Sequence, residues 1–249
     1  MLLRQVFLLF IPILFVWLLW QGYRHQLRSL FRMMSTLAIA TIILIAAIVP
    51  WTVRNYQAFH TFVLLNTNAG FAFFWGNHPI HGYNFISILP ADGPTYFELI
   101  PPELLSLNEA ELDRALLNRS MQFIQEDPVR YLILSASRTK DYFKFWPSSS
   151  SNLMSNLSRV LSFGILLPFM IYGFIRYLPY SLFSKRLILY LFVISYSGIH
   201  LLSWALIRYR LPVDAVLLIF ASLTIIEIST VIYRRQHKAK NAFEFGSAR

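Results

Sequence analysis

The sequence contains no cysteine among its 249 residues. Disulfides and thiolate-ligated metal ions are therefore excluded within this chain, and so are the zinc sites that require cysteine. Charged residues are also scarce at 14%, whereas hydrophobic residues make up 56% and the mean hydropathy is +0.52. Such a chain is too apolar for an ordinary soluble domain, and its composition is typical of a membrane protein with several spans.

The sequence also lacks the short catalytic motifs that have a recognisable spacing. It has no glycine-rich phosphate loop, no nucleophile elbow and no His-Glu-x-x-His pattern. Three histidines lie in the long polar segment, His60, His78 and His81, but no third ligand stands at a recognisable spacing from the pair His78 and His81. We therefore predict no metal site and no cofactor.

The net charge of +10 is distributed unevenly along the chain. Residues 54–150 hold seven basic and nine acidic side chains, whereas the remainder holds fifteen basic and three acidic ones. The basic charge therefore lies beside the apolar runs, which indicates membrane orientation rather than binding of nucleic acid.

Apolar runs of roughly the length needed to cross a bilayer predict an all-α integral membrane protein with about five transmembrane helices. We expect the spans at residues 6–22, 34–53, 160–177, 187–206 and 213–233. The predicted organisation is two transmembrane helices with a basic cytoplasmic loop in residues 1–53, an extracytoplasmic segment in 54–152, three transmembrane helices in 153–234, and a basic cytoplasmic tail in 235–249.

Basic residues predict the orientation of these spans. Eleven lysines and arginines fall on one set of loops and the C-terminal tail, against four near helix ends on the other side. Because the side richer in basic residues is normally cytoplasmic, we expect the N-terminus outside and the C-terminus in the cytoplasm.

Two helices are predicted inside the outer segment. Asn108 to Glu111 matches a capping box and precedes apolar residues at helical spacing. Asp127 followed by Pro128 is a second helix start, and the run that it opens continues to Pro147. We expect both helices to be amphipathic and to lie at the outer membrane surface with their apolar faces toward lipid.

Polar residues and aromatics alternate in residues 50–82, PWTVRNYQAFHTFVLLNTNAGFAFFWGNHPIHG. One interpretation is an ordinary interfacial loop with aromatic anchors, and the other is a pocket wall where an arginine meets a phosphate. Arg208 and Arg210 pose the same choice at the start of the last span, since they either snorkel to headgroups or bind an anionic substrate beside Tyr209.

This stretch resembles the segment that follows a central transmembrane helix in bacterial GT-C glycosyltransferases of the glycosyltransferase family 39 type, such as protein mannosyltransferases and lipid A aminoarabinose transferases. The resemblance rests on Pro-Trp-x-x-Arg-Asn-Tyr from Pro50, on the Asn-x-Gly step at Asn68, and on Gly-Asn-x-Pro from Gly76. Two later stretches, EDPVRYLILSASRTKDYFKFWP and RYRLPVDAVLLIFAS, resemble a second outer helix and the entry to a late span.

The resemblance implies sugar transfer from a polyprenyl-phosphate donor to a lipid or glycan acceptor at the outer face of a bacterial inner membrane. The expected donor-binding residues are Arg54, Asn55, Asn68, Asn77, Arg208, Tyr209 and Arg210. The family takes its catalytic carboxylate from a first outer loop, which has no counterpart here, so no catalytic residue is assigned. Asp92 and Glu98 are the outer acids nearest this stretch, but nothing in the pattern assigns the base to them.

The missing base leaves two interpretations of the chain open. It is either a glycosyltransferase, expected to be the C-terminal part of one, or a non-catalytic module that binds a lipid-linked glycan or a partner membrane subunit. An upstream membrane subunit could then carry the catalytic acid. A transporter is a weaker third choice, since no paired interrupted helices repeat between the two halves.

Overall fold

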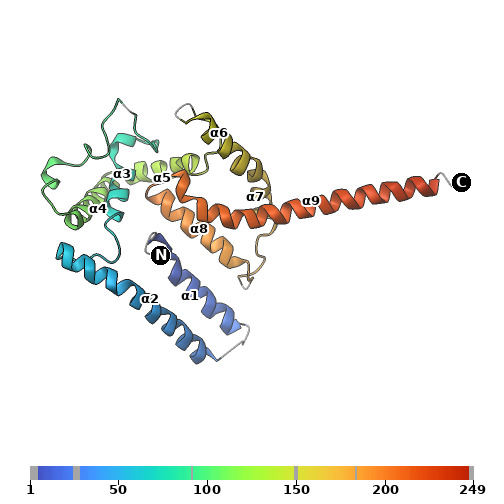
Figure 1. Ribbon diagram of the computed structural model, residues 1–249, viewed down its shortest axis with the longest axis horizontal. Helices are drawn as coiled ribbons and strands as arrows, with labels where there is room; N and C mark the ends of the chain where they lie inside the picture. Colours follow the sequence, from blue (N-terminus) through green and yellow to red (C-terminus); the bar gives the residue numbers. More distant parts are fainter. Residues whose placement is uncertain (1–4, 25–28, 91, 149–150, 183, 247–249) are drawn as a thin grey trace. The chain divides into compact units, whose positions relative to one another are not determined.

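The computed structural model describes residues 5–24, 29–90, 92–148, 151–182 and 184–246, with the side chains after residue 237 left out of the description. Within these ranges all regular secondary structure is helical. The α-helices are α1 (Val6–Arg24), α2 (Leu30–Phe59), α3 (Ala69–Asn77), α4 (Glu109–Glu126), α5 (Pro128–Tyr142), α6 (Leu153–Arg159), α7 (Ile165–Arg176), α8 (Leu187–Leu202) and α9 (Leu211–Gly246) (Figure 1). Short 3₁₀ helices are η1 (Pro79–His81), η2 (Pro102–Leu104) and η4 (Ile207–Tyr209), and the π-helical turn Val160–Gly164 joins α6 to α7.

Four helices in the described ranges are long and apolar enough to cross a membrane. They are Val6–Arg24, Leu30–Phe59, Leu153–Arg176 and Leu211–His237. The predicted span at residues 187–206 corresponds to α8, which is apolar but has only 16 residues. At 1.5 Å per residue this helix is shorter than a hydrocarbon core of about 30 Å. By length and composition the described residues therefore contain four membrane-spanning helices and not the predicted five.

Helix α2 extends beyond both ends of the predicted span. Ser29 caps its start by accepting a hydrogen bond from the Arg32 N–H at 3.4 Å, and His60 ends it in the left-handed conformation with φ of 52°. Pro50 therefore lies within a continuous helix. The predicted polar stretch begins on the last turns of this helix and not in a loop.

The third and last predicted spans are also longer in the structure, whereas the fourth ends at Leu202 and not at residue 206. The third span begins at Leu153, where Asn152 caps α6 by accepting from the Ser155 N–H at 2.8 Å. Helix α9 continues through most of the predicted tail to Gly246, because Arg, Gln, Lys and Ala favour helix and no proline interrupts them.

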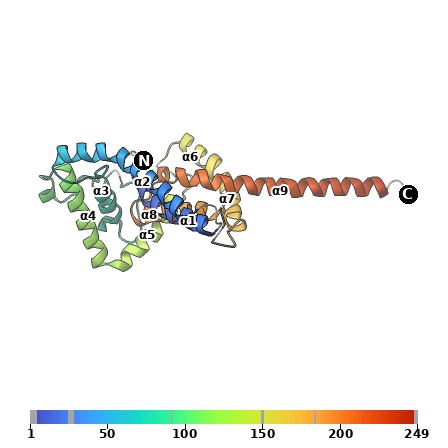
Figure 2. The same ribbon diagram turned by 90° about the horizontal axis from the view of Figure 1, so that it is seen from below.

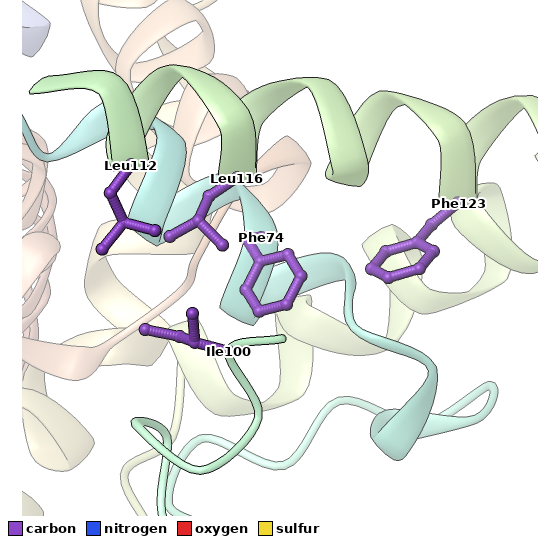
Figure 3. Close-up of a cluster of buried hydrophobic side chains, with 5 residues drawn as sticks. All are labelled: Phe74, Ile100, Leu112, Leu116 and Phe123. Atoms are coloured by element: carbon purple, nitrogen blue, oxygen red, sulfur yellow. The ribbon is translucent and has the colours of Figure 1, made fainter. Parts of the chain in front are cut away.

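The structure confirms helices at both positions predicted in the outer segment. Asn108 and Glu111 form the capping box of α4, and the Asp127 carboxylate caps α5 by accepting from the Arg130 N–H at 2.8 Å. The apolar face of α4 packs on α3 rather than lying open to lipid, in a core of buried side chains (Figure 3): Phe74, Ile100, Leu112, Leu116 and Phe123. Helices α3 and α4 lie side by side in both views (Figures 1 and 2).

The chain divides into two compact units that alternate along the sequence. The first comprises residues 1–144 and 182–210, and the second comprises residues 145–181 and 211–249. In the second unit α7 packs along α9, where Gly173 faces the backbone of Phe220 and the Thr224 hydroxyl donates to the Phe169 carbonyl at 3.1 Å. Glu227, which lies within the predicted span 213–233, accepts from the Tyr177 hydroxyl at 2.9 Å in this unit.

Candidate functional site

Arg54 is the arginine of the Pro-Trp-x-x-Arg-Asn-Tyr stretch, and it is exposed, as are Trp51 and Tyr56. It lies on the last turns of α2, with its guanidinium 5.8 Å from the centre of the Trp51 ring. The same guanidinium donates to the Asn55 side-chain oxygen at 3.2 Å. An exposed guanidinium stacked on an indole at the end of an apolar helix is well suited to meet a phosphate at the lipid boundary.

Asn55, the residue that follows this arginine, has a structural role. Its side chain is buried, and its amide donates to the carbonyls of Val63 at 3.3 Å and Leu65 at 2.9 Å. The Thr52 hydroxyl donates to the Leu64 carbonyl at 2.7 Å. These bonds hold the segment after α2 against the end of the helix, so Asn55 positions the backbone around Arg54.

Asn68 precedes α3 as its N-cap residue but makes no side-chain capping bond, and its side chain is exposed. The Asp113 carboxylate of α4 satisfies this helix end instead, by accepting from the Phe71 N–H at 3.1 Å. Burial raises the pKa of Asp113, while hydrogen bonds from the N–H groups of Phe71 and Gly70 act in the opposite direction. Position 70 requires glycine because α3 and α4 lie so close there that a Cβ would overlap the Asp113 carbonyl oxygen.

Asn77 lies at the centre of a polar network in the first unit. It is completely buried; its side-chain oxygen accepts from an Arg138 guanidinium nitrogen at 2.6 Å, and its amide donates to the Phe73 carbonyl at 2.8 Å. A Cβ at the preceding Gly76 would overlap the Ser203 carbonyl oxygen. The Gly-Asn step of the sequence therefore lets the end of α3 pack closely against the chain that follows α8.

Arg138 is fully buried and joins three segments of the first unit. One guanidinium nitrogen donates to the Ser135 hydroxyl at 3.0 Å and the Leu201 carbonyl at 2.8 Å, and the other donates to Asn77 and to the Gly76 carbonyl. Burial lowers the pKa of Arg138 to about 10. The side chain thus links α5 to the ends of α3 and α8.

Arg130, two turns earlier on α5, makes a similar bridge. Its guanidinium donates to the Asn77 carbonyl at 2.9 Å and to the Gly82 carbonyl at 3.5 Å. Both arginines are buried by the same helix face as Leu134 and Tyr142. Sequence reasoning missed this pair, although arginines at positions 130 and 138 share the four-residue spacing of those apolar side chains.

His81 and His78 adjoin this network. His81 is buried, with its Nε2–H donating to the Trp75 carbonyl at 2.7 Å and its Nδ1 accepting from the Ile86 N–H at 3.4 Å, which is the pattern of a neutral imidazole. Burial lowers the pKa of His81. Burial, helped by the neighbouring His81 and Arg130, lowers the pKa of His78 to about 4. In the part of the chain that the structure describes, no group of three His, Cys, Asp or Glu side chains could hold a metal ion.

The second predicted cluster has one exposed and one buried arginine. Arg210 is buried, donates to the Tyr142 carbonyl at 2.7 Å and lies over the Phe143 ring, so it contributes to packing beneath α5. Arg208 is exposed and stacks over Tyr209, with 5.3 Å between its guanidinium carbon and the ring centre. Tyr209 in turn stacks on His200 at 4.8 Å.

The predicted site residues therefore fall into two groups. Three are buried and bound to protein atoms: Asn55, Asn77 and Arg210. Arg54, Asn68 and Arg208 are exposed and Tyr209 is half-buried, so these side chains can reach a ligand. The structure brings the predicted residues together in two pairs, because Arg54 is hydrogen-bonded to Asn55 and Arg208 lies over the Tyr209 ring.

The two candidate acids near this stretch are both exposed. Glu98 accepts from the Thr95 N–H at 2.7 Å and from its hydroxyl at 3.0 Å, and these bonds lower the pKa of the Glu98 carboxyl. Glu98 thus closes a local turn. Asp92 has an exposed side chain on the same connecting segment.

Comparison with known proteins gave no match of this chain to a family model, to a curated protein or to a solved structure.

Proposed function

We propose that this chain is a membrane glycosyltransferase, or the donor- and acceptor-binding part of one, which uses a polyprenyl-phosphate-linked sugar at the outer face of the membrane. The observation that carries the proposal is the position of Arg54. Within a sequence stretch that resembles the GT-C enzymes, it is the exposed arginine at the end of an apolar helix, beside an asparagine that fixes the backbone.

The donor is amphiphilic, and the architecture offers a place for each of its parts. Its isoprenoid tail would lie in lipid along the apolar helices, and its phosphate would accept hydrogen bonds from Arg54 or Arg208. The sugar would then face the outer segment near Asn68. The buried Arg138 network supports this arrangement by fixing the segment that follows α3.

Transfer needs a carboxylate that accepts the proton of the acceptor hydroxyl. Most acids of the outer segment already have a structural partner: Glu98, Glu109, Glu111, Asp113 and Asp127 each accept a backbone or hydroxyl hydrogen bond. This observation favours a second candidate function, a non-catalytic module that binds a lipid-linked glycan and acts with a partner subunit.

The experiment is sugar transfer in proteoliposomes supplied with radiolabelled polyprenyl-phosphate sugars, together with a donor-binding assay on the same preparations. The variants are Arg54→Gln and Arg208→Gln, and the control is Arg114→Gln, which removes an exposed arginine from α4. Arg210 is unsuitable for this comparison because its buried side chain packs beneath α5. Hydrogen bonds from a charged group contribute about 1.5–3 kcal/mol, so loss of one contact should weaken donor binding by about 10- to 100-fold.

Three outcomes separate the candidates. Transfer that falls in both site variants and persists in Arg114→Gln supports the enzyme. Donor binding without transfer, weakened by the same variants, supports the module. Absence of both transfer and binding with every donor would reject both functions.

A further inference from the structure

An apolar groove runs between α1 and the start of α8 in the first unit. Its cavity volume is about 440 Å³. The lining side chains are all apolar or aromatic: Pro12, Ile13, Val16, Trp17, Trp20, Leu182, Leu187 and Leu191. One flanking helix, α1, is long and apolar enough to cross a membrane and the other, α8, is a shorter apolar helix, so the hydrocarbon of a lipid is a suitable filling for this groove.

The two helices are antiparallel, which places particular residues at each end of the groove. Phe7, near the start of α1, stacks on Phe192 and makes a tilted contact with Tyr196, both in α8, with ring centres 6.0 Å and 5.1 Å apart. Trp17 and Trp20, near the end of α1, line the groove together with residues at the start of α8. The end of α1 and the start of α8 therefore lie at the same level.

Exposed basic residues adjoin the helix ends at this level of the groove. Arg24 ends α1, and Lys185 and Arg186 stand immediately before α8. The sequence predicts that these residues face the cytoplasm, where anionic lipids attract basic groups next to a membrane helix. An apolar groove with a cationic end complements a lipid that has a negatively charged headgroup.

Trp17 provides a second and independent indication. Its indole nitrogen is buried and has no hydrogen-bond partner among the residues that the structure describes, and the ring lines the groove. Buried indole N–H groups normally find an acceptor, and a hydrocarbon chain offers none. The ester carbonyl of a glycerolipid is an acceptor of the right kind at the boundary between chain and headgroup.

We propose that this groove, named here the α1/α8 groove, is a binding site for an anionic glycerophospholipid of the leaflet that faces the basic loops. One acyl chain occupies the cavity, an ester carbonyl accepts from the Trp17 N–H, and the phosphate is held by Arg24, Lys185 and Arg186. The site is separate from Arg54 and Arg208, which the sequence predicts on the opposite face, and it does not depend on the proposed transferase activity.

The test is native mass spectrometry of the full chain released from micelles that contain phosphatidylglycerol and phosphatidylcholine with matched acyl chains. We expect one phosphatidylglycerol to remain bound. Each basic residue near a membrane surface contributes about 1 kcal/mol, so the double variant Lys185→Gln/Arg186→Gln should weaken retention by about 10- to 30-fold. Trp17→Phe keeps an aromatic ring but removes the N–H donor, and it should weaken retention of phosphatidylglycerol by about three- to tenfold.

Two variants address the cavity itself. Leu191→Phe and Leu187→Phe each place a larger side chain in the groove and should abolish retention. Ile43→Phe, on an exposed position of α2, makes a matched control that should retain the lipid. Near-UV circular dichroism of every variant verifies that the fold is kept, and the Lys185→Gln/Arg186→Gln pair tests the site without altering the cavity.

Several results would overturn the proposal. Equal retention of phosphatidylcholine would remove the role of the basic residues, and full retention in both phenylalanine variants would remove the role of the cavity. Competition by inorganic phosphate would indicate a site for phosphate alone. Displacement by a polyprenyl phosphate at equal concentration would assign the groove to the donor instead.

Discussion

Because Arg138 is buried and makes four hydrogen bonds, its substitution should loosen residues 54–144 strongly. Arg138→Met keeps a long flexible side chain of similar reach, so it leaves little cavity, but it removes every hydrogen-bond donor. The Leu201 and Gly76 carbonyls and the Asn77 side-chain oxygen would lose their guanidinium partner in a buried place. The change therefore tests hydrogen bonding rather than packing.

The magnitude follows from the four bonds that the guanidinium donates. A net contribution of about 1 kcal/mol per bond, below the range for exposed charged donors because the buried guanidinium has lost its hydration, gives a loss of about 3–5 kcal/mol. The Ser135 hydroxyl can turn to another acceptor, which keeps the loss toward the lower figure. Arg130→Met, which removes two bonds of which one is 3.5 Å long, should cost about 1–2 kcal/mol.

Hydrogen exchange of the backbone amides of α3 and α5, followed by mass spectrometry in detergent micelles, measures this loss locally. A cost of about 3–5 kcal/mol corresponds to about two to four orders of magnitude less protection. The exposed Arg114→Met is the matched control and should leave exchange unchanged.

Unchanged hydrogen exchange in Arg138→Met would have a different physical meaning. A buried guanidinium loses its hydration, and its carbonyl partners carry no full charge to offset that cost. If Arg138→Met exchanged as slowly as the unmodified chain, desolvation would balance the four bonds. The network would then contribute nothing to the stability of this segment, and our reasoning about Arg138 would be refuted.

Three further predictions concern single contacts. Burial lowers the pKa of His78 to about 4, so between about pH 6.5 and 4 the unfolded chain binds more protons than the folded chain. The free energy of unfolding should therefore be highest at neutral pH and fall by about 1–2 kcal/mol as the pH is lowered through that window, after allowance for the half-exposed ring. His78→Asn keeps an acceptor for the Ile80 N–H and should flatten the profile in thermal melts; an unchanged slope would contradict this cause. Gly70→Ala should destabilise by about 1–3 kcal/mol in the same melts through overlap with Asp113, whereas Gly198→Ala, which meets no atom within 4 Å, should be neutral; equal effects would contradict the packing argument. Gly173→Leu should separate α7 from α9, seen as loss of a disulfide crosslink between cysteines introduced at Phe169 and Thr224, and an undiminished crosslink would exclude close packing at Gly173.

The helices of this protein were predictable where a local signal was strong. The capping box at Asn108 and the Asp-Pro start at Asp127 each depend on residues within one turn, and both were predicted correctly. Helix ends in the apolar runs were less predictable. The second span was predicted to end at residue 53, but apolar and helix-forming residues continue α2 to Phe59.

The predicted site was harder to read because a polar residue in sequence can be either a ligand or a structural partner. Asn55 and Asn77 look like pocket residues in the sequence, yet their amides satisfy backbone carbonyls that lie 8 or 10 residues and 4 residues away. Asn68 resembles a helix cap, but the cap comes from Asp113, 45 positions later in the chain. Only the tertiary structure determines which of these roles applies.

The orientation of the outer segment is the central claim, since the donor site and the lipid groove are proposed on opposite faces. The chain has no cysteine, so Asn118→Cys and Tyr180→Cys are single-cysteine proteins without further change, and both positions are exposed. A membrane-impermeant maleimide should label Asn118→Cys in intact cells and Tyr180→Cys only after permeabilisation. Labelling of Tyr180→Cys alone in intact cells would contradict the account and place Arg54 on the cytoplasmic side.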